Sequence, residues 1–332
     1  MAHTVSSVVK KNGSQYAVMS DGVGIPFEVL GPNNGIPVLV TPGGKQGRGV
    51  AKTKIAKDLA DAGYKVLIHD RRNGATADFG IGDGTKTEVE MQVDDTLALM
   101  RHLDMLPAFF TGTSNGARLG VLAYLKEPES VAGLVITDMT GGKKAADFLS
   151  NEYHLKFIKP AKTGGMKEVL KTDFFQAFVK ANPCVEQSVL DTDVNKFLAV
   201  QKTSGDKIKG SAEWPVIGLT KEQLNAINCP TLCIWGRAND PDDGMHTLEV
   251  NTALAKMIPG NTEPEIVLTA DDHPVHEYRP TVVIRWLNQV TNNGTTLPPP
   301  TKPGKPFPWV QVGVAAAVVG VGAYAYLKYS RK

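Results

Sequence analysis

Two spacings of apolar residues divide the first half of the chain into strands and helices. Residues 4–30 alternate apolar and polar positions around turn signals such as Asn12-Gly13, which predicts antiparallel strands. Residues 36–41 and 65–69 are continuous apolar runs, which are typical of strands buried on both faces of a sheet.

Apolar residues at helical spacing follow these buried runs, over residues 50–62, 88–104 and 117–125. A further apolar run comes after the third helix, at residues 131–136. Strands and helices therefore alternate over residues 36–138. This alternation predicts an α/β fold with a mostly parallel sheet, because parallel strands need long crossover connections that helices usually supply.

The alternation stops over residues 141–225, which carry helical patterns and no clear strand. It resumes with an apolar run at 230–236, a helix at about 245–258, a strand at 265–270 and a last helix at about 276–290. We therefore expect a helical insertion, a lid, that covers the carboxyl ends of the strands, where an open α/β sheet binds its ligands.

The end of the chain differs in composition from the rest. Residues 292–308 are rich in Pro, Gly and Thr, which predicts an extended linker. Residues 309–327 contain no charged side chain, precede the basic tail 328–332, and carry aromatic residues such as Trp309 and Tyr326 near their ends. This pattern predicts a single-pass transmembrane helix.

These boundaries predict six segments along the chain. The core is expected in two pieces, residues 1–140 and 226–291, on either side of a lid at 141–225. A linker at 292–308, a transmembrane helix at 309–327 and a tail at 328–332 follow.

The predicted anchor also implies a topology. The N-terminal residues lack the apolar stretch of a signal peptide, so we expect a tail-anchored protein whose globular domain faces the cytosol. A moderately apolar helix with a short basic tail is similar to the anchors of the mitochondrial outer membrane and the peroxisome. The endoplasmic reticulum is a third candidate membrane.

Composition excludes some classes of partner. The chain has 332 residues, a formal net charge of +2 and 42% hydrophobic residues, which suffices for a buried core and does not indicate a nucleic-acid partner. The three cysteines, Cys184, Cys229 and Cys233, are odd in number and show no metal-ligand pattern. We therefore expect neither a disulfide framework nor a metal site.

One stretch carries the strongest candidate for chemistry. A short apolar run at 108–110 leads into Gly112-Thr113-Ser114-Asn115-Gly116 and then into helical spacing, so a serine stands at a sharp turn between a strand and a helix. The pattern G-x-S-x-G in this context is that of a nucleophile elbow, where glycines let strand and helix approach closely. The alternative is a structural turn with an N-capping serine.

A serine nucleophile needs a base, an acid that orients the base, and hydrogen-bond donors for the oxyanion. His273 follows the last predicted strand and is the candidate base, with His276 as its rival. Asp240 follows the preceding strand and is the candidate acid. The backbone N–H of Gly44 is expected to lie opposite that of Asn115 and to form the oxyanion hole with it.

Three other carboxylates remain candidates for the acid: Asp138, at the end of the run 131–136, and Asp242 and Asp243. The proposed set of groups needs no metal and no organic cofactor, because the serine itself forms the covalent intermediate.

The chain order Ser114, Asp240, His273 resembles that of the α/β-hydrolase superfamily, and the resemblance covers about residues 20–291. Trp235-Gly236 is similar to the family's Trp-Gly before the acid. The acid comes one residue later than the commonest family spacing.

Other motifs match the family incompletely. Pro280 stands seven residues after His273, as in the family. The loop Pro42-Gly43-Gly44 shares the family's glycines and lacks its histidine. The segment Asp70-Arg71-Arg72-Asn73-Gly74-Ala75 looks like the family's Asp-x-Arg-Gly-x-Gly, with Asn73 and Ala75 in place of two glycines.

The resemblance implies a serine hydrolase that cleaves a carboxylic ester, thioester or lactone through an acyl-enzyme on Ser114. The stretch 309–327 predicts that this hydrolase is membrane-anchored. The expected partners are a small-molecule acyl substrate and the membrane around residues 309–327, and both the lid and the anchor favour lipophilic substrates. The alternatives are an acyltransferase or peptidase on the same scaffold and a non-enzymatic receptor. The complete order of triad residues counts against the receptor.

Overall fold

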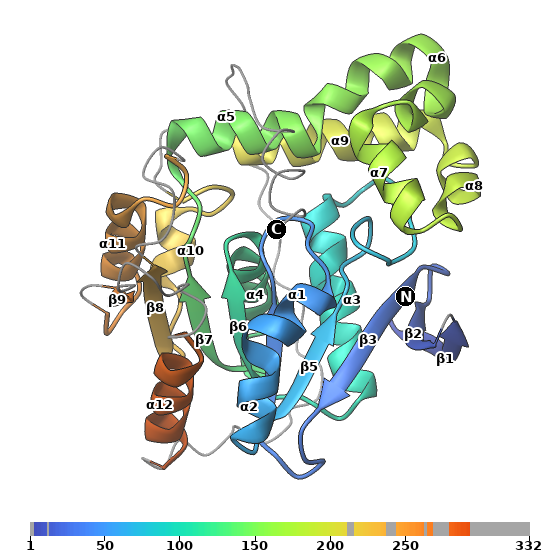
Figure 1. The fold of residues 1–332 in the computed structure, drawn as a ribbon. Helices are drawn as coiled ribbons and strands as arrows, with labels where there is room; N and C mark the ends of the chain where they lie inside the picture. Colours follow the sequence, from blue (N-terminus) through green and yellow to red (C-terminus); the bar gives the residue numbers. More distant parts are fainter. Residues whose placement is uncertain are drawn as a thin grey trace.

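A computed structural model describes residues 3–11, 13–210, 216–236, 244–261, 264–267 and 279–292. A twisted sheet carries helices on both faces, and a separate layer of helices lies over one end of it (Figure 1). Within the described residues the sheet has nine strands, in the order β1-β2-β3-β5-β4-β6-β7-β8-β9. The strands are β1 (Val5–Lys11), β2 (Ser14–Met19), β3 (Gly24–Leu30), β4 (Pro37–Thr41), β5 (Lys65–His69), β6 (Ala108–Thr113), β7 (Val131–Thr137), β8 (Thr231–Gly236) and β9 (Glu265–Val267).

The sheet is antiparallel at one edge and parallel over the rest. Strands β1, β2 and β3 pair antiparallel in sequence, and β3 pairs antiparallel with β5, as the alternating pattern near the N-terminus predicts. Strand β4 pairs parallel with both β5 and β6, and parallel pairing continues through β7, β8 and β9. The prediction of a mostly parallel sheet is therefore confirmed.

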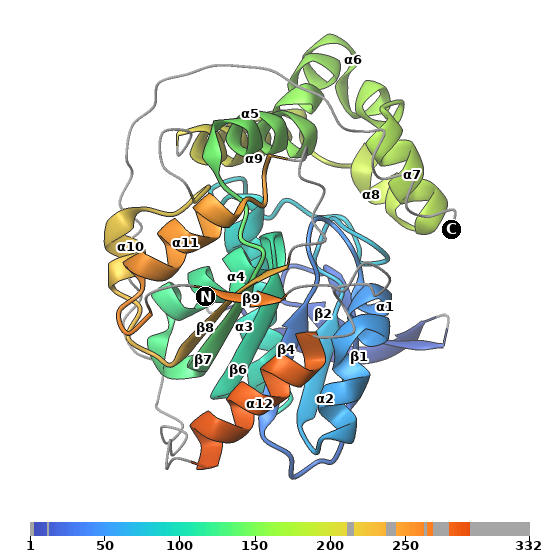
Figure 2. The same ribbon diagram turned by 60° about the vertical axis from the view of Figure 1, so that its left-hand side comes forward.

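Two groups of helices cover the two faces of the sheet (Figure 2). One face packs against α3 (Glu88–His102), α4 (Asn115–Lys126), α10 (Lys221–Asn225) and α11 (Leu248–Met257). The other face packs against α1 (Arg48–Ala51), the π-helical turn η1 (Lys52–Ala56), α2 (Lys57–Asp61) and α12 (Arg279–Asn292). The helix predicted at residues 50–62 is thus interrupted by a π-helical turn.

A layer of further helices, here called the helical layer, lies beyond the carboxyl ends of the parallel strands (Figure 1). Its helices are α5 (Gly142–Tyr153), η3 (Leu155–Phe157), α6 (Ile158–Leu170), α7 (Asp173–Ala181), α8 (Val185–Leu190) and α9 (Val194–Lys209). Among the described residues of 141–225 there are helices and turns and no strand. Phe157, Phe175 and Phe197 form the centre of this layer and pack with Phe79 and Met91 below it.

The turn after β5 keeps an unusual backbone conformation where the sequence departs from the family motif. Asn73 and Ala75 have φ values of +62° and +48°, in the left-handed region that glycine adopts most easily. Asp70 fixes this turn, because its carboxylate accepts hydrogen bonds from the backbone N–H and the hydroxyl of Thr76 and from Arg48. Asn73 and Ala75 therefore adopt a backbone conformation that suits the glycines of the family motif.

The predicted linker, membrane helix and tail, residues 292–332, lie outside the described residues except for residue 292. Within the described ranges no helix is both long enough and apolar enough to cross a bilayer. The transmembrane helix at 309–327 therefore stays a prediction.

Candidate active site

Ser114 occupies a sharp turn between β6 and α4, with φ +53° and ψ −117°. Such a conformation costs a non-glycine residue about 1–3 kcal/mol and persists only where the surroundings impose it. The Ser114 N–H donates to the carbonyl of Thr137 on β7 at 2.9 Å, and its own carbonyl accepts from the Arg118 N–H at 3.1 Å. The turn places the serine side chain at the amino end of α4.

The two glycines of the G-x-S-x-G pattern are there for steric reasons. A Cβ atom on Gly112 would lie 2.4 Å from backbone atoms of Gly116 and Ala117. A Cβ atom on Gly116 would lie 2.2 Å from the carbonyl oxygen of Thr41 at the end of β4. Any side chain at either position would separate the helix from the sheet, so the elbow depends on both glycines.

The hydroxyl of Ser114 lies in a triangle with two other polar groups. Its Oγ is 2.7 Å from Oγ1 of Thr140 and 3.0 Å from Nε2 of His246. The third side of the triangle, from Thr140 Oγ1 to His246 Nε2, is 3.2 Å. His246 is itself anchored, because its carbonyl accepts a hydrogen bond of 2.8 Å from the indole of Trp235. An imidazole within hydrogen-bond reach of a serine hydroxyl is the arrangement that general-base activation needs.

His246 is the residue that sequence reasoning missed. It follows the carboxyl end of β8, at the same end of the parallel sheet as the elbow, and this position was the available signal. The candidates His273 and His276 lie outside the described residues, as do Asp240, Asp242 and Asp243.

Asp138, the remaining candidate acid, is described. It follows β7 with φ +48° and is 3% exposed. Its Oδ1 accepts the backbone N–H of Gly236 at 2.8 Å, while its own N–H donates to the carbonyl of Ile234 at 2.9 Å. Asp138 therefore ties the ends of β7 and β8 together next to the elbow.

The residues predicted to form the oxyanion hole lie beside each other. The Asn115 side chain donates to the carbonyl of Gly44 at 3.3 Å, and Gly44 has φ +52°. A Cβ atom on the preceding residue, Gly43, would lie 3.3 Å from the Cβ of Ser114. Among the described residues, the backbone N–H groups of Gly44 and Asn115 donate to no other group. Within the part of the chain that the structure describes, both amides are available to an oxyanion, and Asn115 adds the positive end of the α4 dipole.

Charged and aromatic side chains join the oxyanion loop to the helical layer. Lys45 Nζ lies 2.8 Å from Glu88 Oε1 and 4.7 Å from the ring centre of Phe174 on α7. Glu88 is buried, and burial by itself raises the pKa of its carboxyl. The charge of Lys45 acts in the opposite direction, and the pKa of Glu88 lies below its ordinary value. His154 is also buried, and burial lowers its pKa to about 4, so it is neutral at pH 7. The His154 ring shares a hydrogen bond of 3.0 Å with Gln201 of α9, which is a structural role.

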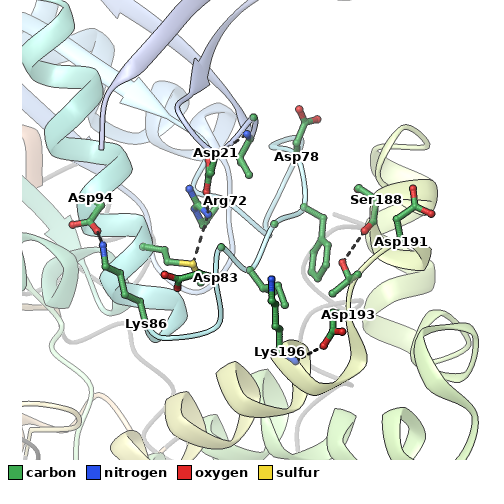
Figure 3. A pocket seen from close by; sticks show the side chains of 18 of the residues that line it. Asp21, Arg72, Asp78, Asp83, Lys86, Asp94, Ser188, Asp191, Asp193 and Lys196 are labelled. Atoms are coloured by element: carbon green, nitrogen blue, oxygen red, sulfur yellow. Dashed lines mark hydrogen bonds and ion pairs between the residues drawn. The ribbon is translucent and has the colours of Figure 1, made fainter. Parts of the chain in front are cut away.

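A large cavity among the described residues lies away from the elbow. It has a volume of about 820 Å³ and lies between the helical layer and the loop 78–86 (Figure 3). Charged residues line it, and several pair with each other, for example Lys86 with Asp94 at 2.6 Å and Arg72 with Asp21 at 2.9 Å. Neither the elbow serine nor His246 borders this cavity. In the described ranges no group of His, Cys, Asp and Glu side chains could hold a metal ion.

The strand order and the serine elbow at the end of β6 define a protein of the α/β-hydrolase class. The family model described as alpha/beta hydrolase fold matches residues 36–278, and the chain belongs to this family. No curated protein sequence gives a significant match.

Solved structures of similar fold come from several bacteria. They include an α/β hydrolase from Sphaerobacter thermophilus, with 20% identity, a TM-score of 0.53, and coverage of 85% of this chain and 100% of that one. A hydrolase from Pseudomonas aeruginosa has 18% identity and a TM-score of 0.55, with 85% and 99% coverage. An esterase from Thermogutta terrifontis has 19% identity and a TM-score of 0.53, with 89% and 100% coverage. At these identities the likeness shows the fold.

Proposed function

We propose that this protein is a serine hydrolase that cleaves a carboxylic ester, thioester or lactone through an acyl-enzyme on Ser114. One observation carries the proposal: the strained elbow holds the Ser114 hydroxyl 3.0 Å from the imidazole of His246, at the amino end of α4. The membership of the α/β-hydrolase family agrees with this chemistry.

The reaction follows from the positions of these groups. A histidine takes the hydroxyl proton, and Ser114 Oγ attacks the acyl carbonyl. The N–H groups of Gly44 and Asn115 bind the oxyanion, where one such donor is typically worth about 3 kcal/mol in the transition state. The leaving group departs with the proton from the imidazole. Water, activated by the same histidine, then hydrolyses the acyl-enzyme.

Two histidines are candidates for the base, and each rests on a different argument. The chain order of the family assigns the role to His273, with Asp240 as its acid. The described contact of 3.0 Å with Ser114 Oγ assigns it to His246. Replacing each by Gln separates them: loss of the base lowers kcat by at least about 10³-fold, whereas loss of a neighbouring hydrogen-bonding histidine costs about 10-fold.

Labelling with a fluorophosphonate probe tests the proposal as a whole. We expect wild type to be labelled and to hydrolyse p-nitrophenyl butyrate, and Ser114→Ala to do neither, with kcat at least about 10⁴-fold lower. Ser130→Ala is the control, because Ser130 is buried beyond the far end of α4 and should leave labelling unchanged. A wild type that is not labelled, or an S114A variant labelled like wild type, contradicts the proposal. Product analysis with an added alcohol separates hydrolysis from acyl transfer.

We also propose that residues 309–327 anchor the protein in a membrane with residues 1–291 on the cytosolic side. The absence of charge over this stretch and the basic residues after it support the proposal. Full-length protein should sediment with membranes and resist carbonate extraction, and a chain ending at residue 292 should not. Protection of the globular domain from added protease in intact organelles contradicts the cytosolic orientation.

A further inference from the structure

Arg71 lies behind the loop that carries Gly44. It follows β5, is 4% exposed, and donates from one nitrogen, Nη2, toward three consecutive backbone carbonyls. The distances are 3.0 Å to Pro42 O, 3.4 Å to Gly43 O and 2.5 Å to Gly44 O. A buried guanidinium directed at three carbonyls of one loop fixes the path of that loop.

The direction of these carbonyls determines where the loop amides point. In a trans peptide the C=O and the N–H of the same plane point in opposite directions. The carbonyl of Gly43 turns toward Arg71, so the N–H of Gly44 in the same plane turns away from Arg71. The carbonyl of Gly44 is held from both sides, by Arg71 and by the Asn115 side chain at 3.3 Å.

We propose that Arg71 is a positioning residue that orients the Gly44 N–H as an oxyanion donor. This inference rests on the proposed function, because it assigns a role within the same reaction. Arg71 touches no reacting atom and acts through the loop it holds. Its contribution to catalysis is to set the donor in place before the oxyanion forms, so that little reorganisation is needed during the reaction.

The side-chain chemistry at this position agrees with the role. Burial lowers the pKa of Arg71 to about 10, and the nearby Glu88 and Asp70 charges oppose that fall, so the group keeps its charge at neutral pH. Its other terminal nitrogen, Nη1, is buried and has no hydrogen-bond partner among the described residues. A planar guanidinium can span several carbonyls, whereas the ammonium of lysine is a more compact charge on a flexible chain.

The next residue, Arg72, provides a matched control. It is 1% exposed and also follows β5, but its guanidinium binds Asp95 at 2.5 Å and 2.6 Å and Asp21 at 2.9 Å. Arg72 therefore stabilises the fold through carboxylates, and its guanidinium hydrogen bonds go to Asp95, Asp21 and Met91 and not to the oxyanion loop. Replacing either arginine should lower stability, because both side chains are buried. Only replacement of Arg71 should also lower kcat.

The experiment compares Arg71→Lys, Arg71→Met and Arg72→Lys in the full-length chain. The readouts are kcat and KM for p-nitrophenyl butyrate, with kcat expressed per site titrated by the fluorophosphonate. We expect R71M to lower kcat by about 10- to 100-fold with KM changed less than about threefold, because a displaced donor acts mainly in the transition state. R71K should recover some of the loss, and R72K should keep kcat within about threefold while lowering Tm.

Hydrogen exchange of the peptide that spans residues 40–47 supplies a second readout. R71M should exchange faster there than wild type, and R72K should not. The inference is overturned if folded R71M keeps its kcat per titrated site, or if loop exchange is unchanged. A wild type that neither hydrolyses the ester nor reacts with the probe overturns the proposed function and this inference with it, whereas an active wild type with an active R71M overturns the inference alone.

Discussion

The elbow around Ser114 and the helical layer are held to the rest of the molecule by different kinds of contact. At the elbow the backbone of α4 packs directly against the backbone at the end of β4. Gly116 lies so close to Thr41 that no side chain fits between them. In the helical layer, large side chains fill the space between helices, and Phe175 contacts the rings of Phe79 and Phe157 at centroid distances of 5.6 Å and 5.2 Å.

This difference predicts different responses to substitution. A backbone contact cannot adjust without moving a strand or a helix, whereas a side-chain core relaxes to some extent around a smaller residue. The elbow should therefore fail abruptly when atoms are added to it. The helical layer should lose stability in proportion to the apolar surface and packing that are removed.

The largest effect is expected from adding one methyl group at the elbow. Gly116→Ala places a Cβ 2.2 Å from the Thr41 carbonyl oxygen, and we expect a loss of about 3–5 kcal/mol in the free energy of unfolding, or no folded protein. Gly120→Ala in the same helix is the control, because its Cβ would meet Phe110 and Leu134 at ordinary distances of 3.4 Å and 3.5 Å. Since alanine favours a helix over glycine, G120A should stay within about 1 kcal/mol of wild type. Urea unfolding measures both, and equal losses in the two variants contradict the steric explanation.

A smaller and graded effect is expected in the helical layer. Phe175→Ala removes a ring that is 2% exposed and should cost about 3 kcal/mol. The partly buried Val179 on the same helix is the control, and Val179→Ala should cost about 1 kcal/mol or less. Hydrogen exchange should show the F175A loss first in α6–α9. If exchange in F175A instead becomes faster at the elbow before it does in the helical layer, the two regions do not respond separately.

The same difference explains how much the sequence could predict. The strands, the elbow and its helix depend on local patterns: continuous apolar runs, helical spacing, and glycines on both sides of Ser114. The closeness of Gly112 and Gly116 to neighbouring backbone gives the physical reason for the pattern. Fold class and elbow were therefore predictable from nearby residues alone.

Contacts between distant segments were not predictable in this way. His246 reaches Ser114 across 132 residues of chain, and its position after β8 is a weak signal that many solvated histidines share. The contact of Arg71 with the oxyanion loop likewise depends on β5 lying beside β4 in the sheet. The roles of His273 and Asp240 remain predictions from chain order.

A pH-dependent effect is expected where the helical layer meets the rest of the molecule. The pKa of buried His154 is about 4, below its ordinary value of 6.5, chiefly because burial disfavours its charged form. The folded protein therefore binds fewer protons than the unfolded chain between these two values, and stability is lost as pH falls from about 6.5 toward 4. Between pH 7 and pH 5 this group alone should account for a loss on the order of 2 kcal/mol.

His154→Asn isolates this contribution, because asparagine can keep a hydrogen bond to Gln201 and does not titrate. The variant should lose less stability than wild type between pH 7 and pH 5, because the nearby charges of Glu88, Lys45 and Arg118 then act on a side chain that does not titrate. His102→Asn on the exposed end of α3 is the control for replacing a histidine as such. Urea unfolding at the two pH values provides the measurement. Equal slopes in wild type and H154N would mean that the pKa of His154 is the same in the folded and the unfolded protein, and that burial does not disfavour its charged form.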